Sequence, residues 1–137
     1  MKELITGIVL ATTIVWAARL AGFEKDRSFY PVLLIVIAFY YVLFSFQSYQ
    51  IDQVLFEALI AFSFAAVALW GYHKSLFIVG VALILHGTYD LFHGFIPLST
   101  TAPDWWPLFC LGVDVVLGIW LIYRVYRKQE HQNQMHQ

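Results

Sequence analysis

Five long apolar runs take up most of this 137-residue chain and limit what it can fold into. Each run is 17 to 21 residues long, and an α-helix needs about 20 apolar residues to cross the hydrocarbon core of a bilayer. The strands of a membrane barrel would instead alternate polar and apolar side chains over about 10 residues. The sequence therefore predicts an all-α, polytopic integral membrane protein, a five-helix bundle with helices over residues 4–23, 30–46, 54–72, 76–96 and 105–123.

Composition excludes several classes of soluble protein. Apolar residues make up 61% of the chain and charged residues only 12%, about half the charged share of a soluble domain. A disordered chain would be poorer in apolar residues, and a nucleic-acid-binding protein would carry a basic patch, whereas the formal net charge is -1. The single cysteine, Cys110, cannot form an internal disulfide. The expected partner is the lipid bilayer, and no nucleic acid is expected.

The connectors between the runs are short, which favours a single domain. Pro97 and Pro103 interrupt the chain between the fourth and fifth runs, and Pro31 lies in the first turn of the second, where a helix tolerates proline. Residues 1–126 are predicted to form one transmembrane domain and residues 127–137 a polar cytoplasmic tail. The first run is longer than the apolar core of a signal peptide, so we expect it to stay as an uncleaved helix.

Basic residues fall on one side of the predicted topology. If the N-terminus lies outside, the outer side receives only Lys2. The inner side then receives seven residues, namely Arg19, Lys25, Arg27, Lys74, Arg124, Arg127 and Lys128. Because membrane proteins keep Lys and Arg on the cytoplasmic side, the sequence predicts an N-terminus outside and a C-terminus in the cytoplasm.

Five ionisable residues lie inside the runs, where the bilayer makes them costly: Glu57, His86, Asp90, His93 and Asp114. At about 1.5 Å per residue from the outer helix ends, all five fall in the outer half of the membrane. His86, Asp90 and His93 are spaced by four and three residues, so they lie within an arc of about 60° on one helix face. This pattern predicts a polar site in the outer leaflet.

Small residues indicate where neighbouring helices approach this site. They form three stripes: Gly80, Gly87 and Gly94 in the fourth run, Ala61, Ala65 and Ala68 on the face of Glu57, and Cys110 and Gly118 one turn either side of Asp114. Small residues let helix backbones come close in a membrane. We therefore expect the five ionisable residues to face other helices and not lipid.

The charges in the outer half favour a bound cation. Apart from Lys2 there is no Lys or Arg there, so the carboxylates of Glu57, Asp90 and Asp114 must take up protons or find a cation. Two imidazoles and two or three carboxylates suit a divalent transition metal such as Zn²⁺, Fe²⁺ or Mn²⁺. In the leading hypothesis His86, Asp90 and His93 hold the metal. Asp114 or Glu57 then completes the ligand set or acts as the general base on a metal-bound water.

The sequence leaves three functions open, and it does not establish whether the chain is an enzyme. The first is a metal-dependent, hydrolase-like membrane enzyme acting on a lipid or other apolar small molecule. The second is a small cation- or proton-coupled transporter, for which a homo-oligomer would supply the missing repeat. The third is a non-catalytic subunit whose metal-free polar network fixes helix register.

Four other residues carry weaker signals. Cys110 is expected to be a small apolar filler more than a thiolate ligand. Tyr40 and Tyr41 are expected to be core or interface aromatic residues, although one of them would be able to donate to a site carboxylate. Arg19, near the inner end of the first run, is expected to extend to the headgroups.

Three segments resemble a small family of uncharacterised bacterial membrane proteins, a domain of unknown function. They are Asp26-Arg27 with Tyr30-Pro31, His86-Gly87-x-x-Asp90-x-x-His93, and Trp106-Pro107-x-x-Cys110-x-x-x-Asp114. The resemblance implies a polytopic protein of the bacterial inner membrane and no particular activity. The layout is also similar to membrane hydrolases of the alkaline ceramidase type, which hold zinc with His and Asp inside a helical bundle. This chain departs from them in having five spans instead of seven and no matching Ser.

Overall fold

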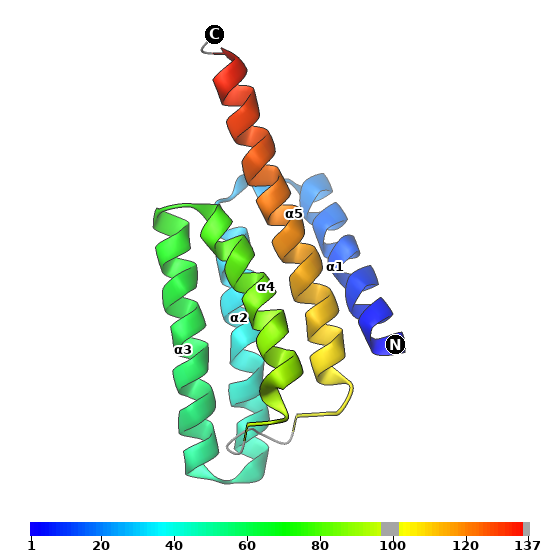
Figure 1. Ribbon diagram of the computed structural model, residues 1–137, viewed down its shortest axis with the longest axis vertical. Helices are drawn as coiled ribbons and strands as arrows, with labels where there is room; N and C mark the ends of the chain where they lie inside the picture. Colours follow the sequence, from blue (N-terminus) through cyan, green and yellow to red (C-terminus); the bar gives the residue numbers. More distant parts are fainter. Residues whose placement is uncertain (97–101, 136–137) are drawn as a thin grey trace.

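A computed structural model describes residues 1–96 and 102–135, and within these ranges the chain forms a helical bundle (Figure 1). Its five α-helices are α1 (Lys2–Ala21), α2 (Phe29–Ser45), α3 (Ile51–His73), α4 (Leu76–His93) and α5 (Trp106–Met135). All five are long and apolar enough to cross a membrane, and the described residues contain no strand. The prediction of an all-α, polytopic membrane protein is therefore confirmed.

Local sequence signals fix several helix ends. Gly22 follows α1 in the left-handed conformation, with φ of 79°, and its N–H donates to the carbonyl of Arg19, as at many helix C-termini. Ser75 caps α4, because its side-chain oxygen accepts a hydrogen bond from the N–H of Phe77. Short 3-10 turns at Phe23–Lys25 and Phe46–Ser48 lie in the first two connectors.

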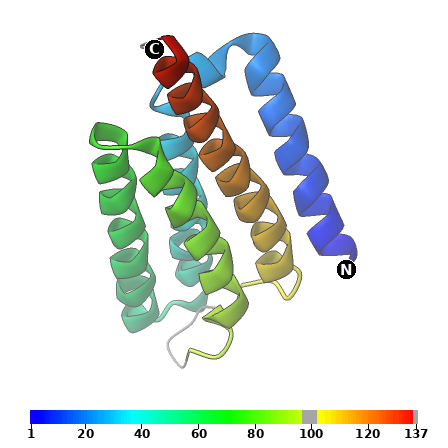
Figure 2. The same ribbon diagram turned by 45° about the horizontal axis from the view of Figure 1, so that its top comes forward.

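The helices run alternately up and down, so the two termini lie at opposite ends of the bundle (Figure 1). The neighbours in the bundle are α1 with α5, α5 with α4, and α4 with α3, while α2 packs against both α3 and α4 (Figure 2). Every second connector therefore lies at the same end of the bundle. The start of α5 and the end of α4 share the end that carries the N-terminus.

Glycines bring α4 and α5 close together. A Cβ atom added to Gly118 would lie 2.7 Å from the carbonyl oxygen of Gly80, and one added to Gly87 would lie 3.0 Å from the Cβ of Asp114. A Cβ at Gly94 would meet nothing within 4 Å. The predicted glycine stripe is confirmed at Gly80 and Gly87 and is wrong at Gly94, which lies just past the end of α4 where no helix covers it.

The bundle buries a few polar residues and exposes many large apolar ones, unlike a typical soluble domain. Leu34, Leu83 and Leu117 are fully buried in the core, whereas Leu59, Phe62 and many other large apolar side chains lie on the outer surface. The buried polar or charged residues in the described ranges are Ser45, Glu57, His86, Asp90, His93 and Asp114. An apolar exterior of this kind suits a lipid environment.

The last helix, α5, continues past the apolar run as far as Met135. From Arg127 onward its residues are exposed, and all but the last, Met135, are polar; Arg, Lys, Gln and Glu are good helix formers. This extension projects beyond the rest of the bundle (Figure 1).

Candidate functional site

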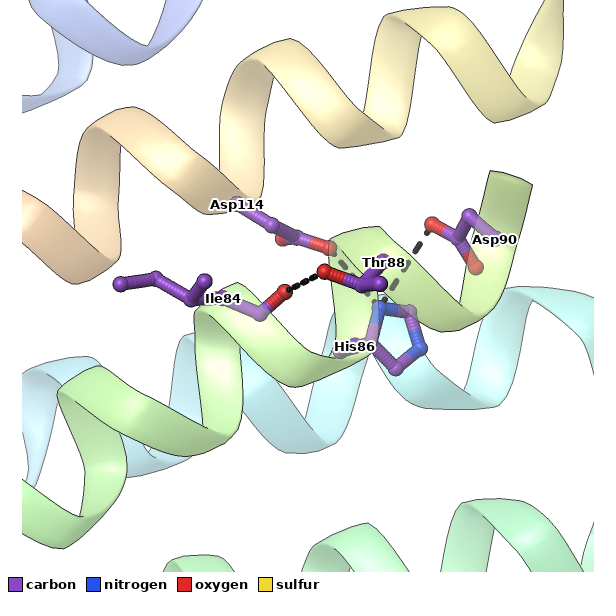
Figure 3. Close-up of polar contacts among 5 residues, drawn as sticks. All are labelled: Ile84, His86, Thr88, Asp90 and Asp114. Carbon is purple, nitrogen blue, oxygen red and sulfur yellow. Dashed lines mark hydrogen bonds and ion pairs between the residues drawn. The ribbon is translucent and has the colours of Figure 1, made fainter. Parts of the chain in front are cut away.

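His86, Asp90 and Asp114 converge in the interior between α4 and α5 (Figure 3). The His86 Nδ1 atom lies 2.8 Å from Asp114 Oδ2 and 3.6 Å from Asp90 Oδ2. Each of the three residues offers one potential ligand atom, and these atoms all lie within 4.8 Å of one another. All three side chains are buried, so this His/Asp triad is closed off from the surface.

The triad is assembled from two helices by ordinary helix geometry. Asp90 follows His86 by one turn of α4, which places both side chains on one face, and Asp114 reaches them from α5. Gly87 allows this approach, because a Cβ there would lie 3.0 Å from the Cβ of Asp114 and 3.3 Å from the Cα of Leu111. Thr88 does not join the triad, since its hydroxyl donates to the Ile84 carbonyl at 2.8 Å on the exposed side of α4 (Figure 3).

The other two predicted residues, Glu57 and His93, form a separate buried pair. The Nε2 atom of His93 lies 2.6 Å from Glu57 Oε1, and the two side chains come from α4 and α3. All five residues singled out in the sequence are therefore buried in the bundle, as a triad and a pair. Their roles as metal ligands or catalytic groups stay predictions.

Two tyrosines lie between the triad and the pair. The ring of Tyr41 packs on the imidazole of His93, with centroids 3.9 Å apart, and its hydroxyl lies beside the Asp90 carboxylate. Tyr89 contacts both imidazoles, with centroid distances of 6.3 Å to His86 and 5.5 Å to His93. Sequence reasoning missed Tyr89, although it lies three residues after His86 and four before His93 and so shares their helix face.

Several polar atoms of the triad lack hydrogen-bond partners within the described residues. They are both carboxylate oxygens of Asp90, Oδ1 of Asp114 and Nε2 of His86. No Lys or Arg forms an ion pair with the triad in the described part of the chain. Buried polar groups are normally satisfied, so the triad carries unused acceptor and donor capacity where burial is costly.

Cys110 lies one turn before Asp114, and its thiol is beside Asp90. It is buried and free of any disulfide, and its role as a filler or a ligand stays a prediction. Cys110 also lines an apolar groove of about 360 Å³ between α1, α2 and α5, together with Tyr40, Trp105, Trp106 and other apolar side chains. One residue of the groove lining thus contacts the triad.

Comparison with known proteins identifies a family and no activity. A family model described as a family of unknown function (DUF6010) matches residues 2–127, which include the triad and the pair. No curated protein and no solved structure matches the chain significantly. The family resemblance expected from the sequence is thereby confirmed, and the function has to be argued from the site.

Proposed function

We propose that this chain, which belongs to the DUF6010 family of unknown function, is a membrane-embedded metalloenzyme that acts on a lipid or other apolar molecule. In this proposal His86, Asp90 and Asp114 hold one divalent transition metal ion, Zn²⁺, Fe²⁺ or Mn²⁺. The observation that carries it is the convergence of three buried donor atoms within 4.8 Å of one another.

The spacing of the donor atoms supports a metal. Zinc bonds to nitrogen and oxygen ligands of about 2.0–2.2 Å in a tetrahedron place neighbouring ligand atoms about 3.4 Å apart. The two separations from His86 Nδ1, 2.8 Å to Asp114 and 3.6 Å to Asp90, lie on either side of that value. Small side-chain rotations would therefore seat the ion without moving either helix.

The charges of the triad and its oxygens without hydrogen bonds among the described residues also support a bound metal. One neutral imidazole and two carboxylates neutralise a divalent cation, which lowers the cost of placing it in an apolar interior. The oxygens that find no hydrogen-bond partner among the described residues, both of Asp90 and one of Asp114, are also the atoms that remain available to an ion. Three protein ligands with one open position is the pattern of catalytic zinc.

The Glu57–His93 pair supplies a candidate acid–base group. A metal in the triad would make a bound water nucleophilic at neutral pH. Glu57 contacts His93 at 2.6 Å, about two helix turns from His86, so it is proposed as the final acceptor of that water's proton, passed on through Tyr41 and Tyr89, which lie between the pair and the triad. Asp114 then serves as a ligand, although the sequence alone also allowed it to be the base.

The apolar groove that Cys110 helps to line supports an apolar substrate. It lies between α1, α2 and α5, and its walls are almost entirely apolar. In a bilayer this groove would face acyl chains, so a lipid or similar molecule could enter sideways toward Asp90. The basic residues gather at the end of the bundle that carries the C-terminus, which the positive-inside rule assigns to the cytoplasm. We therefore propose that the triad lies in the outer leaflet of a bacterial inner membrane.

Metal analysis of the detergent-purified protein tests the proposal. We expect about one equivalent of a transition metal per chain, bound by three protein ligands, and its loss in His86→Ala and Asp90→Asn. Thr88→Val is the matched control, because Thr88 lies on the same helix but outside the triad. A folded protein that contains no metal and takes up no added Zn²⁺, Fe²⁺ or Mn²⁺ would overturn it.

A second candidate is a non-catalytic subunit whose polar network fixes helix register. The observation in its favour is the 2.8 Å contact between His86 and Asp114, which joins α4 and α5 without an ion. The same metal analysis separates the two candidates, since only the first requires a stoichiometric ion.

A further inference from the structure

A second groove, between α1 and α5, combines an apolar wall with one positive charge. Its volume is about 530 Å³, and its lining is mostly apolar, with Val15 and Trp16 from α1 and Val116 and Ile119 from α5. Arg19 is the lining residue furthest along α1, two residues before that helix ends. This groove shares no lining residue with the His/Asp triad.

Neighbouring contacts hold Arg19 in place. Its guanidinium carbon lies 5.2 Å from the ring centroid of Trp120, a cation–π contact. The indole N–H of Trp120 donates to Glu24 Oε1 at 2.7 Å, and the hydroxyl of Tyr30 donates to the same oxygen. The indole ring that Arg19 contacts is therefore held in place by Glu24.

The charge of Arg19 is left available to an outside anion. Glu24, the acid at this end of the groove, pairs with Arg124 through its other oxygen at 3.6 Å. Among the residues that the structure describes, Arg19 forms no ion pair, and its side chain is exposed. A guanidinium presents several N–H donors that match the oxygens of a phosphate group.

We propose that this groove binds an anionic phospholipid. The lipid phosphate lies on Arg19, and one acyl chain lies along the apolar wall between α1 and α5. The complementarity is of charge at one end and of apolar surface along the rest, over about 10 Å of helix from Thr12 to Arg19. Exposed Trp16 and Tyr123 flank the groove, and such aromatic residues favour the headgroup region.

The same end of the bundle adds a positive field that favours an anionic headgroup over a zwitterionic one. Lys25, Arg27 and Lys128 line a polar depression there with Arg124. Each basic residue near an anionic membrane surface adds to the attraction. The site stands independently of any metal in the triad.

Native mass spectrometry of the full chain tests the site with phosphatidylglycerol and phosphatidylcholine of identical acyl chains. We expect phosphatidylglycerol to be retained preferentially, and Arg19→Gln to weaken its binding about tenfold through loss of a charge-assisted contact. Arg127→Gln is the matched control, because it removes the same charge from the exposed extension of α5. It should change binding far less.

Filling the groove tests the acyl chain. Ile119→Trp should weaken binding of both lipids, since it occupies the apolar wall and leaves Arg19 in place. The proposal is wrong if the unmodified protein shows no preference for phosphatidylglycerol, or if Arg19→Gln binds it as well as the unmodified protein does. It is also wrong if Ile119→Trp changes only the oligomeric state, because the groove then belongs to a second copy of the chain.

Discussion

The two carboxylates beside His86 make different contributions to the fold. Asp114 makes a 2.8 Å contact with the imidazole and so joins α4 to α5. Asp90 lies 3.6 Å away, and neither of its oxygens makes a hydrogen bond within the described residues. Burial of a polar group without such a bond costs free energy. Asp90 is thus the less well satisfied of the two carboxylates, although the Tyr41 hydroxyl and the Cys110 thiol lie beside it.

Substitution of each carboxylate by leucine separates stability from metal binding. In metal-free protein, Asp114→Leu should lower the free energy of unfolding by about 1–2 kcal/mol, because an interhelical hydrogen bond is lost. Asp90→Leu should lower it less or raise it, because an unsatisfied buried group is removed. Denaturant titration in detergent micelles measures both values. A larger loss for Asp90→Leu than for Asp114→Leu would show that Asp90 has a structural role.

Helix periodicity placed the site residues only partly. The spacing of four between His86 and Asp90 put both on one face, and the structure brings them together. His93 lies on nearly the same face, but seven residues advance a helix by about 10 Å along its axis. This distance explains why His93 meets Glu57 of α3 instead of the triad. Its partner depends on how α3 packs, which one sequence does not specify.

At the scale of helices, the contact between α4 and α5 sets the geometry of the triad. Gly87 lies against Leu111 and Asp114 of α5, and a Cβ there would be 3.3 Å from the Leu111 Cα. The backbone cannot yield as a flexible side chain would, so a larger residue must push the helices apart. The separation of His86 from Asp114 then changes with the separation of the helices.

A larger residue at position 87 should therefore weaken metal binding even though Gly87 is not itself a ligand. We expect Gly87→Val to destabilise the fold by about 1–3 kcal/mol through overpacking and to weaken metal binding. Gly94→Ala is the control, because a Cβ at Gly94 meets nothing within 4 Å. Metal titration followed by thermal unfolding measures both effects. Equal behaviour of the two variants would contradict the role given to helix proximity.

At the scale of the whole molecule, the lengths of the apolar runs predict the architecture better than any sequence motif does. Five runs predicted five membrane-compatible helices, and these are present. The order in which the helices pack was beyond the sequence, because an apolar helix surface suits lipid and protein equally well. Gly80 and Gly87 were local exceptions to this limit. They predicted that some helix packs closely on the fourth run, and the structure shows that this helix is α5.

This arrangement gives the two ends of the bundle different chemistry. Asp90 lies in the last turn of α4 and Asp114 in the first half of α5, toward the end of the bundle that carries the N-terminus (Figure 1). Arg19 lies in the last turn of α1, toward the other end. The lipid groove and the proposed metal centre are therefore separate, and either can be lost without the other.

The most direct test of the metal centre is anomalous X-ray diffraction from crystals of the metal-loaded protein. The account predicts one anomalous peak between α4 and α5, with His86, Asp90 and Asp114 as ligands at about 2.0–2.2 Å. A peak on Glu57 and His93 alone, on His131 of the exposed extension, or nowhere in the bundle would contradict it.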